Sequence, residues 1–171
     1  MCAMRIYALF MAAFVGVAPL LAQDAALPAP PAEVGVPFYL DIAAGQLKKL
    51  ATEPYKEHNG SGPFTYNAPQ TVQVEGAASA LRIPSQNKIV FVFDATIFPK
   101  LYKFEVHHKK REFQFATASP HNSKLLESLP IAVSRYKETA YQFSSDHPLA
   151  PGEYAIEFAD RIFTFGVDSA K

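Results

Sequence analysis

The chain has 171 residues, which is room for one domain, and its hydrophobic content of 49% excludes an intrinsically disordered protein. Basic and acidic residues balance at 16 each, so no net charge attracts the protein to nucleic acid or to an anionic membrane. The one cysteine, Cys2, lies before the first apolar run, which excludes a disulfide framework and thiol catalysis in the folded domain.

The N-terminus has the pattern of a secretory signal peptide. Arg5 is followed by 17 residues, from Ile6 to Ala22, that carry no charge, and Gln23 ends this apolar run. We therefore expect a signal peptide over residues 1–22 and a periplasmic or secreted protein with no membrane span after cleavage. The alternative is an uncleaved anchor, because 17 residues approach the shortest helix that spans a bilayer.

Residues 23–35 are expected to form a linker, because the three prolines between Ala25 and Glu33 favour an extended, unpaired backbone. The folded domain is expected over residues 36–168, with a short tail at 169–171. Its roughly 135 residues suffice to bury about two-thirds of the unfolded surface, so the domain can be stable without disulfides.

The domain sequence has the pattern of short strands separated by turns. Residues 38–42 and 46–50 are expected to form a hairpin around a turn at 43–45. Residues 51–70 are rich in glycine, proline and asparagine, and predict a long loop. The run KIVFVF at 88–93 is apolar on both faces and predicts a central strand covered on both sides. Further strands are expected at 71–75, 80–83, 102–106, 113–115, 131–133, 141–143, 154–158 and 163–167.

Strands that recur about every 8–12 residues, without a sustained helical period, are typical of a sandwich or barrel. We expect an all-β, antiparallel, Ig-like β-sandwich of about 8–10 strands, with at most one short helical turn at 123–129. The polar residues between 106 and 113 predict a hairpin tip. Six side chains are expected to share one core: Phe91, Phe104, Phe115, Tyr154, Ile156 and Phe165.

No catalytic or cofactor motif is present. The sequence has no HExxH, no GxSxG, no glycine-rich phosphate loop and no Cys/His metal spacing, and it has no tryptophan for stacking sugars. We therefore infer no catalysis and expect no cofactor. A metal site at His107 and His108 is opposed by regular strand geometry, because neighbours on a strand point to opposite faces; at a hairpin tip the two side chains could converge. A glycosidase needs two carboxylates at a set separation, and the candidates are Asp41, Glu75, Asp94 and Glu105.

One run of basic residues is a candidate binding surface around the predicted hairpin tip. A cationic patch there would suit an anionic envelope polymer. The alternative, which we favour, is a solvated tip whose lysines block edge-to-edge pairing of sheets. The residues of the run are Lys100, Lys103, His107, His108, Lys109, Lys110 and Arg111.

Three aromatic residues, Tyr55, Phe64 and Tyr66, punctuate the predicted long loop. Exposed aromatic side chains on a loop would favour contact with an envelope protein, because loops often carry function. The alternative is that these side chains fold back and cover the core.

Several segments resemble a group of uncharacterised exported bacterial proteins. The resemblance extends over most of residues 35–168 and includes GVPFYLD, VEGAASALRI, LYKFEVHHKKREF and PLAPGEYAI. Its recurring positions are Phe38, Tyr39, Gly76, Ser79, Arg82, Pro151 to Tyr154 and Phe163 to Val167. The resemblance implies export and a β-sandwich, and brings no activity with it. We expect an interaction module of the bacterial envelope; the alternatives are an envelope-polymer hydrolase and a domain that binds a small ligand or a metal.

Overall fold

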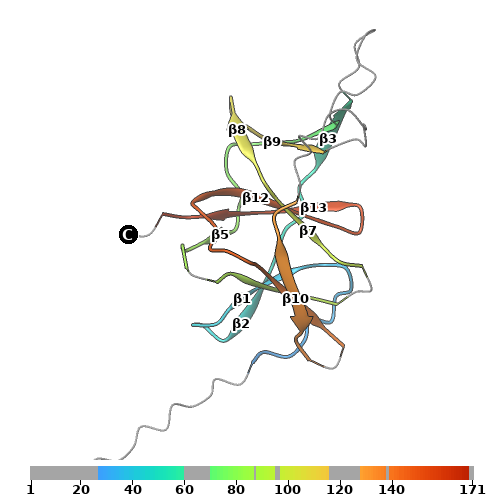
Figure 1. Ribbon diagram of the computed structural model, residues 1–171, viewed down its shortest axis with the longest axis vertical. Helices are drawn as coiled ribbons and strands as arrows, with labels where there is room; N and C mark the ends of the chain where they lie inside the picture. The colour runs from blue at the N-terminus through green and yellow to red at the C-terminus, as the bar shows by residue number, and fades with distance from the viewer. Residues whose placement is uncertain are drawn as a thin grey trace, which may run out of the picture.

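The computed structural model describes residues 27–59, 70–86, 88–94, 97–115, 128–137 and 139–169. These residues form 13 β-strands in three sheets and contain no helix (Figure 1). The predicted all-β sandwich is confirmed, with more strands than expected, whereas the Ig-like topology stays a prediction. The predicted signal peptide and most of the predicted helical turn lie outside the described residues. In the described part of the chain, no helix is long and apolar enough to cross a membrane.

The five-stranded sheet lies at the bottom of Figure 1 and is antiparallel throughout. Its strands, in spatial order, are β10 (Ile131–Arg135), β11 (Tyr141–Ser145), β6 (Val90–Phe93), β1 (Phe38–Asp41) and β2 (Gln46–Lys49). Strands β1 and β2 form the predicted hairpin. Strand β6 lies at the centre and all of its residues are buried, which confirms the predicted doubly covered strand.

The middle sheet runs across the centre of Figure 1 and has a core on each face. Its strands, in spatial order, are β5 (Arg82–Ile83), β13 (Arg161–Val167), β12 (Gly152–Phe158) and β7 (Lys100–Lys103). The pair β13–β5 is parallel and the others are antiparallel. Because side chains alternate along a strand, β12 sends Tyr154 and Ile156 to one core and Ala155 to the other.

The third sheet lies at the top of Figure 1 and was only partly predicted. Its strands, in spatial order, are β3 (Tyr55–Asn59), β4 (Gln70–Glu75), β9 (Lys110–Phe115) and β8 (Glu105–His107). The prediction of a loop over 51–70 is wrong at β3, which pairs with β4 along its whole length. The strand predicted over 102–106 is divided at Phe104 between the middle sheet and the third sheet.

The first core lies between the five-stranded sheet and the middle sheet. Phe91 and Phe143 come from the first of these, and Tyr154, Ile156 and Phe165 from the second. The rings of Phe91 and Phe165 are 4.8 Å apart, so the two sheets are in direct contact through aromatic side chains. Four of the six predicted core residues therefore lie in this one core.

The second core lies between the middle sheet and the third sheet, so the fold has three layers. Phe104 belongs here, which corrects the prediction that it shares a core with Phe91. Tyr102 stacks on Phe113 with 4.5 Å between ring centroids. The side chain of Phe115 lies outside the described residues. A strand that leaves the middle sheet at Lys103 and enters the third sheet at Glu105 accounts for the separate core.

The described part of the predicted linker, residues 27–35, contacts the sandwich. The hydroxyl of Tyr136 donates to the backbone oxygen of Pro28 at 2.9 Å, and the backbone N–H of Gly35 donates to Asp94 O at 2.9 Å. Tyr136 is part of a small apolar cluster on the outer face of the five-stranded sheet. The segment before β1 is thus held against the fold at both ends of its described length.

Candidate functional site

The predicted hairpin tip is confirmed. Strands β8 and β9 are joined by His108 and Lys109, and both residues have positive φ, 46° and 67°. This backbone matches the two-residue turns whose twist suits a β-hairpin. His107, His108 and Lys109 are exposed there.

The remaining basic residues of the run are dispersed and lie among carboxylates. The Lys110 ammonium is 3.8 Å from a carboxylate oxygen of Glu75, and His107 Nε2 is 3.2 Å from one of Glu105. Lys103 lies on β7 in the middle sheet, not on the hairpin. These described residues therefore do not form one dense cationic patch, and binding of an anionic polymer stays a prediction.

Arg111 is not on the surface, which corrects its prediction as a tip residue. Its side chain is only 1% exposed and is the largest fully buried side chain in the described part of the chain. The physical reason is that side chains alternate between the two faces of a strand. Arg111 lies two residues before Phe113 on β9, so both side chains point to the same face, and its cross-strand partner is the buried Val74.

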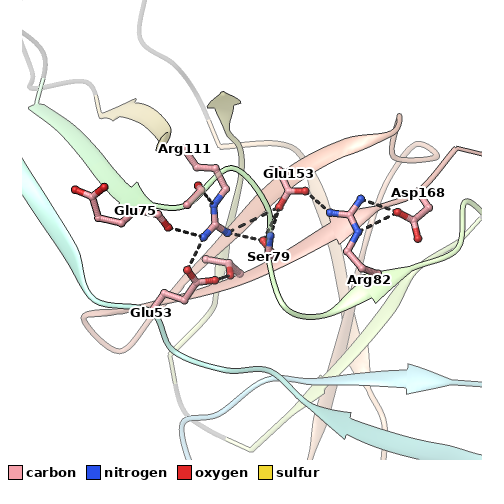
Figure 2. Close-up of polar contacts among 9 residues, drawn as sticks. Glu53, Glu75, Ser79, Arg82, Arg111, Glu153 and Asp168 are labelled. Atoms are coloured by element: carbon pink, nitrogen blue, oxygen red, sulfur yellow. Dashed lines mark hydrogen bonds and ion pairs between the residues drawn. The ribbon is translucent and has the colours of Figure 1, made fainter. Parts of the chain in front are cut away.

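The guanidinium of Arg111 is surrounded by acceptors (Figure 2). Its Nε donates to Gly76 O at 3.0 Å, and its Nη1 donates to Ser79 Oγ at 2.6 Å. Its Nη2 donates to Glu75 O at 3.1 Å and to the carboxylate of Glu53. Gly76 has φ of 88°, a conformation in which a side chain would be strained, so glycine at this position turns its carbonyl toward Arg111 without cost.

A second carboxylate, that of Glu153 on β12, reaches the same guanidinium. Its Oε2 is 3.8 Å from Arg111 Nη1 and accepts from the backbone N–H and the hydroxyl of Ser79 at 2.8 and 2.6 Å. The Ser79 hydroxyl thus donates to Glu153 and accepts from Arg111. Glu153 also accepts from Arg82, as Figure 2 shows.

Arg82 extends this network to the protein surface. Its Nη2 and Nε donate to Asp168 Oδ1 at 2.6 and 2.9 Å. Hydrogen bonding to Asp168, with a further contribution from Glu153, raises the pKa of the Arg82 guanidinium above its usual range. The guanidinium lies directly over Gly166 on β13, where a Cβ atom would occupy its place. Glycine at 166 therefore allows the close approach.

Together these side chains form an internal charge network between the middle sheet and the third sheet. Glu53 links the two sheets, because it accepts from Arg111 on β9 and from the hydroxyl of Thr164 on β13. In the described part of the chain, no buried side-chain nitrogen or oxygen lacks a hydrogen-bond partner. A fully paired network of this kind holds the layers in one arrangement, and removal of one member leaves buried charge without a partner.

Two features of the sequence point to this network, although the amino-acid composition of these segments does not. Arg111 is in phase with Phe113, so the alternation of β9 places it inside. Ser79, Arg82 and Glu153 are among the recurring positions of the resemblance noted above, and they meet in this network. Nothing in the sequence indicated that Glu53 belongs to the network, because it lies in a segment predicted to be a loop.

A second feature is an apolar surface around the turn between β12 and β13, which we call the turn surface: Tyr55, Ile97, Phe98, Ala159 and Asp160. Ala159 and Asp160 make a two-residue turn with φ of 50° and 56°. The side chains of Ile97 and Phe98 are 56% and 63% exposed beside it. The Tyr55 hydroxyl is 3.5 Å from Asp160 O. Tyr55, one of the three predicted contact aromatics, is 36% exposed here.

Two hollows lie at the turn surface. A cavity of about 130 Å³ is lined by Ile97, Phe98 and the turn itself. A larger, shallow hollow of about 410 Å³ is lined by Tyr55, Arg161 and neighbouring residues. The other two predicted contact aromatics, at positions 64 and 66, lie outside the described residues.

A third feature is a cavity of about 230 Å³ beside Lys103, at one end of the first core. Its wall is mostly apolar, with Leu149 and Tyr154 at its base. Lys103 and His147 also line it. In the described part of the chain, three or more metal-ligating side chains do not gather at any one place.

Comparison with protein-family models, with curated proteins and with solved structures finds no match to this chain. The resemblance to exported bacterial β-sandwich proteins therefore stays a prediction that rests on the residues quoted above.

Proposed function

We propose that this protein is an exported interaction module that binds a partner protein of the bacterial envelope through the turn surface. The proposal rests on one observation: Ile97, Phe98 and Tyr55 lie around the Ala159–Asp160 turn. Exposed apolar groups that cluster beside hollows are typical of sites where another protein docks.

The geometry suits a partner with apolar side chains on a convex surface. Such side chains would enter the two hollows of the turn surface. Tyr55 and Arg161 at the larger hollow are of the residue types that most often dominate binding energy, because they combine a large contact area with a polar end. The Lys100–Glu157 ion pair, at 3.4 Å, lies at the rim of the smaller hollow.

Export of the protein is part of this proposal. It is supported by the charged start at Arg5, the apolar run that follows and the small residue Ala22. N-terminal sequencing of the protein recovered outside the cytoplasm should begin near Gln23. An intact N-terminus on membrane-bound protein would instead establish an uncleaved anchor.

The binding proposal is tested by paired substitutions of two isoleucines with similar exposure. Ile97 on the turn surface is 56% exposed, and Ile42 on the five-stranded sheet's first hairpin is 61% exposed. Partners captured from envelope extract by the native protein should be lost by the Ile97→Asp variant and kept by the Ile42→Asp variant. Loss by both, or by neither, would refute the assignment of the turn surface.

A second candidate function is binding of a small ligand in the cavity beside Lys103. The specific observation is an apolar wall with Lys103 and His147 on it, which suits a molecule with a short apolar body and an anionic group. Such a ligand should raise the thermal midpoint of the native protein and not that of the Lys103→Gln variant. An equal shift in both proteins would exclude recognition by Lys103.

A further inference from the structure

The three sheets present six edges, and five of them are protected against pairing with another chain. Strands β2, β3, β7 and β8 each carry charged side chains, and β5 has only two residues. Charged residues and short strands are the devices that natural sheets use against edge-to-edge association.

The sixth edge is β10, and its first four residues carry no charge. Its sequence is IAVSR, with the one charge at the last position, Arg135, and its last four residues are exposed. Strand β10 is the broad orange arrow at the lower centre of Figure 1. Among the described residues it pairs only with β11, as the outermost strand of the five-stranded sheet.

The hydrogen bonds at its two ends show which backbone groups of β10 point outward. Asp146 N donates to Pro130 O at 3.2 Å, and Tyr136 N donates to Ala140 O at 2.9 Å. Even-numbered residues therefore bond toward β11, since backbone groups alternate in direction along a strand. The N–H and C=O groups of Ile131, Val133 and Arg135 point away from the sheet, and no described residue bonds to them.

We propose that β10 pairs with β10 of a second copy of this chain, antiparallel, with the two-fold axis at Val133. This goes beyond the proposed function and does not depend on the turn surface. In this register Val133 meets Val133 of the second copy, and Ile131 meets Arg135. All three are residues whose backbone groups point outward, so each outward donor and acceptor finds a partner.

The side chains support this register. Val133 lies opposite Phe143 of β11, which is in the first core, and Ile131 packs against the same core. Side chains opposite each other across a pair share a face, so the dimer places Ile131 and Val133 of both copies in one apolar strip that continues the two cores.

The charges do not oppose the pairing. Arg135 is the one charged residue of β10. In the proposed register its two copies are about 14 Å apart along the strands, at about 3.4 Å per residue. This exceeds the screening length of about 8 Å at physiological salt, so repulsion between them is weak. A second copy of β10 therefore fits this edge in its backbone groups, its apolar side chains and its charge.

The test is sedimentation velocity of the purified protein over a range of concentrations. The native protein should show a reversible monomer–dimer equilibrium. Val133→Lys places two like charges at the axis and should weaken the dimer roughly tenfold or more. The matched control is Val106→Lys, a valine exposed on the edge strand β8, which should leave the dimer unchanged.

A mixing experiment makes the axis position decisive. At a concentration at which the native protein is just largely dimeric, the Val133→Lys and Val133→Asp variants should each be largely monomeric, and an equal mixture of the two should dimerise, because opposite charges then meet at the axis. Circular dichroism of each variant establishes that it is folded. A native protein that stays monomeric, a dimer that survives Val133→Lys, or a mixture that stays monomeric would each overturn the proposal.

Discussion

Replacement of Arg111 by methionine should destabilise the protein strongly. Methionine has a similar length and no charge, so it removes the guanidinium without creating a large cavity. The change deletes four hydrogen bonds, to Gly76, Ser79, Glu75 and Glu53. It also leaves a carboxylate that lies between two sheets without its counter-ion.

The magnitude follows from what remains around the vacated site. Glu153 keeps its bonds from Ser79 and Arg82, and Glu53 keeps its bond from Thr164. Both carboxylates keep other donors, so the loss should lie near the lower end of the roughly 3–5 kcal/mol that a broken buried ion pair costs. For a domain of this size, this lowers the thermal midpoint by roughly 10–20 °C.

The assay is urea denaturation followed by circular dichroism and by tyrosine fluorescence, since the chain has no tryptophan. The control is Lys109→Met at the exposed tip, two residues away, which should change the free energy of unfolding by less than about 0.5 kcal/mol. A loss below about 1 kcal/mol for Arg111→Met would refute the view that this arginine holds the two layers together.

Three further outcomes follow from the same structure. Gly166→Ala should cost about 1–3 kcal/mol, because the new Cβ displaces the Arg82 guanidinium from Glu153; an unchanged urea midpoint would contradict that contact. Phe165→Ala should cost about 3–5 kcal/mol through the cavity left in the first core, and an unchanged thermal midpoint would mean that β13 does not contribute to this core. Burial, assisted by Glu157, raises the pKa of Tyr102 above its ordinary value of 10.0. Tyr102 therefore ionises first in the unfolded chain, so it should contribute a fall in stability of up to about 1.4 kcal/mol per pH unit above pH 10 that the Tyr102→Phe variant lacks; an equal dependence on pH in the two proteins would contradict this.

Much of the fold could be predicted because its strands carry regular patterns. The hairpin of β1 and β2 and the doubly buried β6 follow from alternation and from an unbroken apolar run. Strand β3 was missed because YKEHN has no apolar alternation; it is an edge strand, and pairing with β4 places it. The second core was not predicted, because residues 102–106 alternate without interruption although the strand is divided at Phe104.

The internal charge network could be predicted only in part. Alternation along β9 places the side chain of Arg111 on the same face as that of Phe113. The neighbouring lysines and histidines, however, give the segment the composition of a solvent-exposed hairpin tip. Glu153 alternates with Tyr154 and Ile156, as a surface residue would, and it is buried because the third sheet covers that face. The local sequence pattern indicates toward which face of the sheet a side chain points. It does not indicate whether a third sheet covers that face, because this depends on contacts between segments distant in the sequence.

Site-specific photocrosslinking in living cells tests the proposed function most directly. A photoreactive amino acid replaces Phe98 on the turn surface, and in a second strain it replaces Ile42, whose exposure of 61% matches the 63% of Phe98. The proposal predicts that one discrete envelope protein is crosslinked from position 98 and not from position 42. Crosslinks to that protein from both positions, or from position 42 alone, would contradict it.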